Sequence, residues 1–221
     1  MKRLNCSLVA AALAVVALCG SSAMAAHLAN PNRLADPSFE GTLTYDGAPF
    51  VGFWEGFSNT GGTTPPSTAE FTTTMPLTGP QAMELNLGDV NGFAGAFQDA
   101  TFSSSLAGNM AWFSGWHKSL GVAGGSEIRI EWRDSVNNVE VSRTPNLTPT
   151  VGSTYEEFVL SATIPAGADT ARVVYAIQSF GAGVSQQVFV DDVNFNVVPE
   201  PASFALLGLA SLALVGMRRR I

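Results

Sequence analysis

Between residues 26 and 198 the apolar side chains recur at every second position. In residues 127–133, Ile128, Ile130 and Trp132 alternate with charged side chains, the pattern of a strand with one buried face. No segment of helical period longer than ten residues occurs in this part of the chain. The alternation predicts further strands at 50–57, 68–75, 83–87, 94–102, 109–118, 139–141, 158–164, 171–177 and 186–197. These short strands predict an all-β fold, an antiparallel β-sandwich, and a jelly roll fits their number.

The first 25 residues have the layout of a secretory signal peptide. Lys2 and Arg3 precede an uncharged apolar run over 8–18, and an Ala-Met-Ala sequence ends at Ala25. The run is too short to span a bilayer comfortably, and we expect signal peptidase to cleave after Ala25. Lipoprotein processing at Cys19 is the alternative, but a large leucine stands just before that cysteine, where this processing needs a small residue.

A second processing segment ends the chain. Pro199, Glu200 and Pro201 are followed by a stretch at 204–217 that carries no charge, and then by a basic cluster. The stretch is short for a membrane helix but can cross a thin bilayer, with the cluster on the cytoplasmic side. The basic cluster consists of Arg218, Arg219 and Arg220.

This tail, residues 199–221, resembles the PEP-CTERM protein-sorting tail. The resemblance covers about the last 24 residues, and its three parts occur in the family's order. It implies that an exosortase recognises Pro-Glu-Pro, cleaves nearby, and releases or transfers the protein from the inner membrane to the cell surface or the exterior. An ordinary C-terminal anchor helix is the alternative.

The composition of residues 26–198 differs from that of the whole chain. The mean hydropathy of +0.21 owes much to these apolar ends. Both cysteines lie in the first 25 residues, so residues 26–198 can form no disulfide. Residues 26–198 contain six of the eleven basic and seventeen of the eighteen acidic residues, a net charge of −11. Such an acidic domain repels phosphate backbones, which argues against nucleic-acid binding.

The two ends of the 26–198 domain carry another resemblance. Residues 36–40 read Asp-Pro-Ser-Phe-Glu, and residues 188–193 read Val-Phe-Val-Asp-Asp-Val. Together with the segment 96–101, they resemble carbohydrate-binding modules of the galactose-binding jelly-roll type. Asp36 stands where those modules more often have asparagine. The resemblance implies the sandwich fold and a glycan ligand.

The same resemblance implies a structural calcium ion that joins the opening and closing strands. Its ligands would be Glu40 and Asp191 or Asp192, with backbone carbonyls, and calcium prefers such oxygen donors. Neighbouring strand residues point to opposite faces, so both aspartates can bind only if a bulge separates them. The alternative is that these acids are solvated or cap turns.

Tryptophans are the candidate glycan platform, because an aromatic face stacks on the apolar face of a sugar ring. Trp54 and Trp132 lie among core-like positions. Trp112 and Trp116 share one face of a strand, and they form an external ladder about 13 Å long if Phe113 faces inward. Burial tendencies favour the core for both.

No catalytic motif is present. The chain has no His-Glu-x-x-His, no Gly-x-Ser-x-Gly and no phosphate-binding glycine loop. His117 is a lone candidate base, and Glu156 and Glu157 point to opposite sides of a strand, unlike a glycosidase pair. We interpret the protein as a non-enzymatic envelope or extracellular-matrix component with extracellular polysaccharide as candidate ligand. The alternatives are a structural biofilm protein that binds no sugar and a secreted glycan-active enzyme.

Overall fold

The computed structural model describes residues 30–59, 66–88, 92–121, 125–179 and 186–198. The signal peptide predicted at 1–25 and the sorting tail at 199–221 lie outside the described residues, so the structure does not test them. Within the described ranges, no helix is long and apolar enough to cross a membrane.

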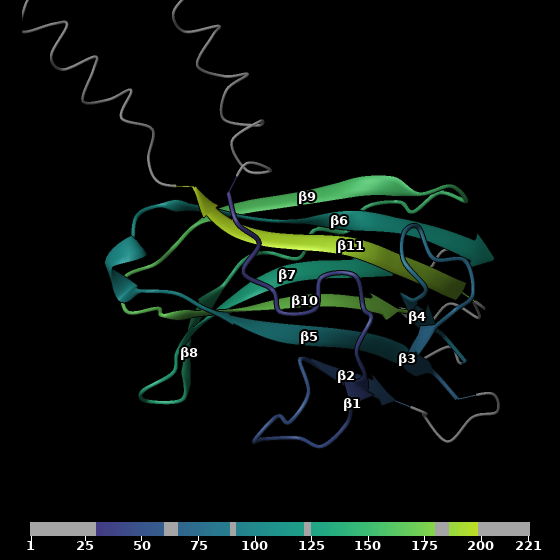
Figure 1. The fold of residues 1–221 in the computed structure, drawn as a ribbon, viewed down its shortest axis with the longest axis horizontal. Coiled ribbons are helices and arrows are strands. Elements are labelled where there is room, and N and C mark those ends of the chain that lie inside the picture. The colour runs from purple at the N-terminus through teal and green to yellow at the C-terminus, as the bar shows by residue number, and fades with distance from the viewer. Residues whose placement is uncertain (1–29, 60–65, 89–91, 122–124, 180–185, 199–221) are drawn as a thin grey trace, which may run out of the picture.

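Strands make up nearly all the regular structure of the described chain (Figure 1). They are β1 (Leu43–Thr44), β2 (Trp54–Asn59), β3 (Thr68–Thr72), β4 (Ala82–Asn86), β5 (Phe93–Thr101), β6 (Met110–Gly121), β7 (Gly125–Asp134), β8 (Val139–Arg143), β9 (Glu156–Thr163), β10 (Thr170–Gln178) and β11 (Gln186–Val198). A single 3₁₀ turn, η1 (Ser104–Leu106), joins β5 to β6. The predicted strands are confirmed, most of them to within a few residues, and β1 is additional.

The strands form two sheets that face each other. Sheet A has the order β1-β2-β5-β10-β7-β8, and sheet B has the order β3-β4-β11-β6-β9. In Figure 1, β9, β6 and β11 lie above β7, β10 and β5. All pairs of named strands are antiparallel except β1 with β2. The predicted antiparallel β-sandwich is therefore confirmed.

The inner faces of the two sheets enclose one hydrophobic core. Trp54 is fully buried and Trp132 almost so, as predicted from the aromatic neighbours of Trp54 and from the alternation of Trp132 with charged residues. Phe39, from the opening segment, packs against the Trp54 ring with centroids 4.9 Å apart. Phe113 is also fully buried, so the inner face of β6 belongs to Phe113 and its alternating neighbours. Each such ring contributes about 1.5–3 kcal/mol through burial.

A bulge interrupts β11 in the middle of sheet B. Its pairing with β6 shifts register between Asp191 and Asn194, and Asp192 has a φ of 48°. A residue in this left-handed region breaks the alternation of the strand. Because of this bulge, the neighbouring side chains of Asp191 and Asp192 can contact the same part of the molecule.

Candidate functional site

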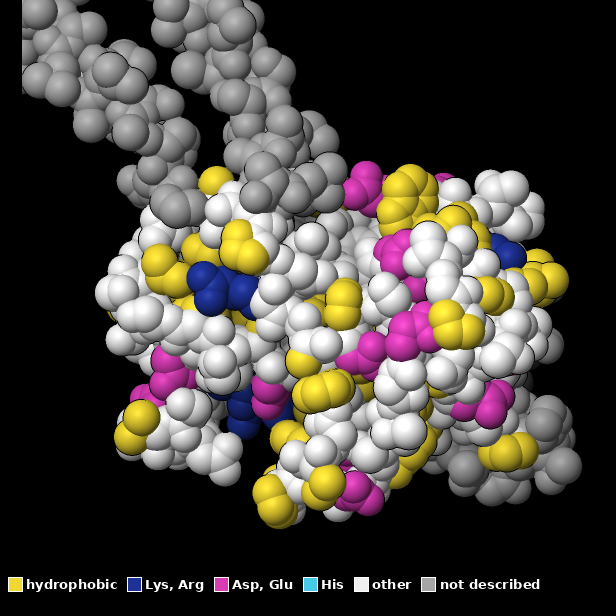
Figure 2. Space-filling view, viewed as in Figure 1, with side chains coloured by type: hydrophobic (Ala, Val, Ile, Leu, Met, Phe, Trp, Pro, Cys, Tyr) yellow, Lys and Arg dark blue, Asp and Glu magenta, His cyan; other side chains and the backbone are white. Residues whose placement is uncertain are grey.

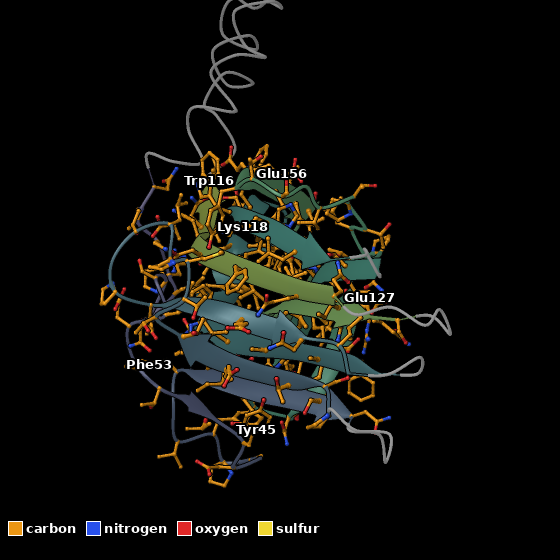
Figure 3. The ribbon with its side chains drawn as sticks, turned by 90° about the vertical axis from the view of Figure 1, so that its right-hand side faces the viewer. Tyr45, Phe53, Trp116, Lys118, Glu127 and Glu156 are labelled. Atoms are coloured by element: carbon orange, nitrogen blue, oxygen red, sulfur yellow. The ribbon has the colours of Figure 1, made fainter. Side chains whose placement is uncertain are left out.

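The outer face of sheet B carries the two tryptophans of β6. Because Phe113 occupies the inner face, Trp112 and Trp116 point outward rather than into the core that burial tendencies favoured. Trp116 is 38% exposed, and Trp112 is half-buried. Figure 3 shows Trp116 at the upper side of the molecule. Across the sheet, Trp116 lies opposite Glu157 on β9 and Asp191 on β11.

A hollow of about 240 Å³ lies beside Trp116. We call it the Trp116 hollow. Its walls combine an aromatic ring with carboxylates, an amide and hydroxyls, a set that can stack on a sugar ring and bond its hydroxyls. The side chains that supply these groups are Trp116, Glu157, Asp192, Asn194, Ser38 and Ser114.

Asp191 and Asp192, the two acids of the bulge, attach the β3–β4 connection to β11. Asp191 is fully buried, and its Oδ2 accepts hydrogen bonds from the backbone N–H groups of Leu77 (2.8 Å) and Thr78 (3.1 Å). Burial raises the pKa of Asp191, and these backbone donors oppose the rise. Asp192 Oδ1 accepts hydrogen bonds from the hydroxyls of Ser38 (3.0 Å) and Thr78 (2.8 Å).

Glu40 reaches the same connection from the opening segment. Its Oε1 lies 3.5 Å from the backbone nitrogen of Gln81. It also occupies the space beside Gly79, where an added Cβ would stand 2.1 Å from the same oxygen. Glu40, Asp191 and Asp192 thus meet around residues 77–81, which joins the opening and closing segments of the domain.

Glu40, Asp191 and Asp192 carry the kind of oxygen donors that calcium prefers, but they are not arranged as a calcium site. Carboxylates and hydroxyls are the oxygen donors that calcium takes. However, the Asp191 carboxylate already accepts three backbone N–H groups, including that of Asp192 at 2.7 Å. Among the described residues, no three His, Cys, Asp or Glu side chains are grouped so that they could hold a metal ion. Hydrogen bonds alone account for the junction, and calcium there stays a prediction.

The outer face of sheet A carries a row of phenylalanines that the strand predictions did not assign to a site. The centroid of Phe57 lies 6.2 Å from that of Phe93 and 6.4 Å from that of Phe97. The guanidinium of Arg172 stands 3.9 Å from the centroid of the Phe97 ring and pairs with Asp99 at 2.7 Å. In β5 the alanines face the core and the aromatic residues face outward, so a prediction from hydrophobicity inverts the two faces.

His117 is enclosed in the core and does not form an open catalytic base. It is 1% exposed, and its Nδ1 lies 2.6 Å from the Tyr175 hydroxyl oxygen. Burial lowers its pKa to about 4, although Glu156, 3.9 Å from Nε2, acts in the opposite direction. The ring is therefore neutral at pH 7.

Glu156 and Glu157 do point to opposite faces of β9, one opposite His117 and the other opposite Trp116.

Comparison with known protein families gives a match to the C-terminal segment of the chain. Residues 197–220 match the PEP-CTERM protein-sorting motif. The chain carries a PEP-CTERM sorting motif. A search of curated protein sequences gave no significant match over the rest of the chain or elsewhere.

Solved structures resemble the β-sandwich of this chain at low sequence identity. The enzymatically active domain of bacteriophage CBA120 tailspike protein 4 has a TM-score of 0.57 at 16% identity, over 76% of this chain and 21% of that one. The tandem CBM22-1–CBM22-2 domain of Paenibacillus barcinonensis Xyn10C has a TM-score of 0.51 at 16% identity, over 78% and 47% of the two chains. The chain thus spans about a fifth and about half of these proteins. At such identity the likeness concerns the fold alone, which this chain shares with the tandem CBM22 domain.

Proposed function

We propose that this protein is an exported, non-enzymatic component of the cell envelope or extracellular matrix that binds glycan in the Trp116 hollow. The observation that carries the proposal is an exposed indole in a polar hollow on the outer face of sheet B. Sugar-binding sites combine an aromatic surface with a few placed polar groups, and the hollow beside Trp116 brings the same groups together.

The chemistry of the hollow suits neutral sugars. The Trp116 ring offers a flat apolar surface for the C–H groups of a pyranose. Glu157 and Asp192 line the same hollow and can accept hydrogen bonds from sugar hydroxyls, and Asn194 can donate or accept. Figure 2 shows acidic side chains distributed over the face in view, with fewer basic ones. An acidic surface of this kind disfavours anionic polysaccharides.

We infer the export route from the predicted signal peptide at 1–25 and the sorting tail at 199–221. Signal peptidase removes residues 1–25, and the tail at 199–221 then holds the domain at the inner membrane. An exosortase acts near Pro199, Glu200 and Pro201, after which residues 26–198 reach the cell surface or the exterior. The sorting motif at 197–220 supports this route.

A binding assay on the mature protein tests the proposal against both alternatives. Neutral polysaccharides, including the host's own exopolysaccharide, should retard the protein in affinity electrophoresis without release of reducing ends. Absence of retardation by every polysaccharide would favour a structural matrix protein, and release of reducing ends would favour an enzyme. The C-terminal mass tests the route, because exosortase processing predicts loss of the tail.

A further inference from the structure

A second hollow lies at the end of β2 in sheet A. The pairing of β2 with β5 begins at Glu55 and Phe97, so the β5 residues beyond Phe97 have no β2 partner. The segment at 50–53 and Ala35 close the gap and leave a hollow of about 220 Å³. We call it the Gln98 slot. The side chains that matter for its chemistry are Phe50, Phe53, Phe97, Glu55, Gln98 and Asp99.

Gln98 has a buried amide nitrogen without a partner. The side chain is 3% exposed, and its Oε1 accepts a hydrogen bond from the backbone N–H of Ala35 at 2.7 Å. This bond fixes which end of the amide is the oxygen. Within the described part of the chain, Nε2 has no hydrogen-bond partner. Buried donors are almost always satisfied by protein, water or ligand, so this nitrogen is a candidate donor to a ligand in the slot.

The two acids of the slot are held in place by other groups. Glu55 accepts hydrogen bonds from the Thr44 hydroxyl (2.8 Å) and from the backbone N–H of Gly47 (2.7 Å). Asp99 is held in a two-bond pair with Arg172, at 2.7 and 2.9 Å. Both carboxylates keep lone pairs for further donors, because each oxygen can accept more than one hydrogen bond.

The aromatic walls of the slot are open to solvent. Phe53 is 60% exposed and Phe50 is 38% exposed. The Phe50 ring meets Phe97 edge to face with centroids 5.1 Å apart, and Arg172 lies 5.1 Å from the Phe50 centroid. The slot therefore combines fixed acceptors, one unsatisfied donor and exposed aromatic surface in a space below the roughly 300–1,000 Å³ of drug-sized ligand sites.

We propose that the Gln98 slot binds one uncharged sugar unit at the end of a glycan chain. Hydroxyls donate to Glu55 and Asp99, a C–H face packs on Phe53, and a sugar oxygen accepts from Gln98 Nε2 after a small shift of that side chain, because Nε2 is buried in the free protein. The carboxylates exclude an anionic sugar, and the slot offers the hydroxyls of a neutral sugar both acceptors and a donor. The volume admits a single ring. This inference rests on the proposed function, because it assumes a glycan ligand.

The position of the slot gives the domain two separate binding surfaces. The Trp116 hollow belongs to the outer face of sheet B, and the slot lies at the sheet A end of the sandwich. Figure 3 shows Trp116 at the upper side of the molecule and Phe53 at the lower side. One domain can therefore hold an internal segment of one glycan chain and the end of another, and so cross-link a matrix.

Titration of the mature protein with methyl glucopyranoside and methyl galactopyranoside, followed by amide NMR shifts, tests the slot. We expect shifts at Gln98 and Phe53, and Phe53→Ala should weaken binding about tenfold through loss of a packed ring. Gln98→Met should weaken it further. Val51→Ala is the matched control, because Val51 is 82% exposed on the same connection and does not line the slot.

The outcomes separate the slot from the proposed function. Trp116→Ala should leave the monosaccharide shifts at the slot unchanged while it reduces retention by polysaccharide. Equal monosaccharide affinity in wild type and Phe53→Ala, or no shifts at the slot, would overturn the inference even if Trp116→Ala still loses polysaccharide. If Trp116→Ala keeps full retention, the proposed site fails, whatever the slot binds.

Discussion

At the scale of single residues, alternation in the sequence shows which side chains share a face of a strand, but it does not show which face is buried. Alternation around Phe113 predicted that Trp112 and Trp116 share a face, and the burial of Phe113 decides that this face is the outer one. Gln98 gave no such signal. Its unsatisfied nitrogen depends on where β2 begins relative to β5, an offset between strands that local sequence does not encode.

His117 makes the first prediction, which concerns pH. Its folded-state pKa of about 4 lies below the unfolded value of about 6.5, so the unfolded state binds the proton more tightly. The neutral His117 ring therefore contributes to the free energy of unfolding fully above pH 6.5. This contribution, about 3 kcal/mol in all, is lost as the pH falls towards 4. Urea unfolding of wild type and His117→Gln at pH 7 and pH 4 should show a smaller pH effect in the variant. An equal effect in both proteins would contradict the burial of a neutral ring.

Asp191 makes the second prediction. Asp191→Ala removes the acceptor of three backbone N–H groups, and charge-assisted bonds are worth about 1.5–3 kcal/mol each before relaxation. We expect a loss of about 3 kcal/mol in the free energy of unfolding and faster amide exchange at Leu77 and Thr78. Asp46→Ala, at an exposed position, is the control. If amide exchange at Leu77 and Thr78 were unchanged, Asp191 would not anchor the β3–β4 connection.

At the scale of elements, the strands were predictable and the connections were not. Period-two alternation located the strands because a sandwich buries one face of each. It did not orient the faces of β5, where the alanines lie inside and Phe93 and Phe97 outside. The connection at 73–81 has no periodicity, and its position over sheet B comes from distant partners such as Asp191.

The β3–β4 connection yields a third prediction, through Gly79. Gly79 has a φ of 59°, and an added Cβ would overlap the Glu40 carboxylate. Gly47 has a similar φ of 68° with nothing within 4 Å of such a Cβ, so Gly47→Ala measures the backbone strain alone. Gly79→Ala should lower the free energy of unfolding by about 1 kcal/mol more than Gly47→Ala. Equal losses would mean that Glu40 does not pack on this connection.

At the scale of the whole molecule, a cysteine-free domain is closed by a junction of its two ends around residues 77–81. We predict that calcium strengthens this junction through Glu40 and Asp192, because an ion bound only by the folded state raises its stability. Calcium should raise the melting temperature by a few degrees, EDTA should reverse the rise, and Glu40→Gln should abolish it. Superimposable melting curves with calcium and with EDTA would leave hydrogen bonds as the sole closure.

The central claim is that Trp116 is the glycan platform, and one titration tests it most directly. Affinity electrophoresis against a neutral polysaccharide that retards the wild type should show a dissociation constant at least about tenfold weaker for Trp116→Ala, with an unchanged melting temperature. Met110→Ala, on the same outer face of β6 and equally exposed at 38%, should bind like wild type. Equal retardation of Trp116→Ala and Met110→Ala would contradict the account.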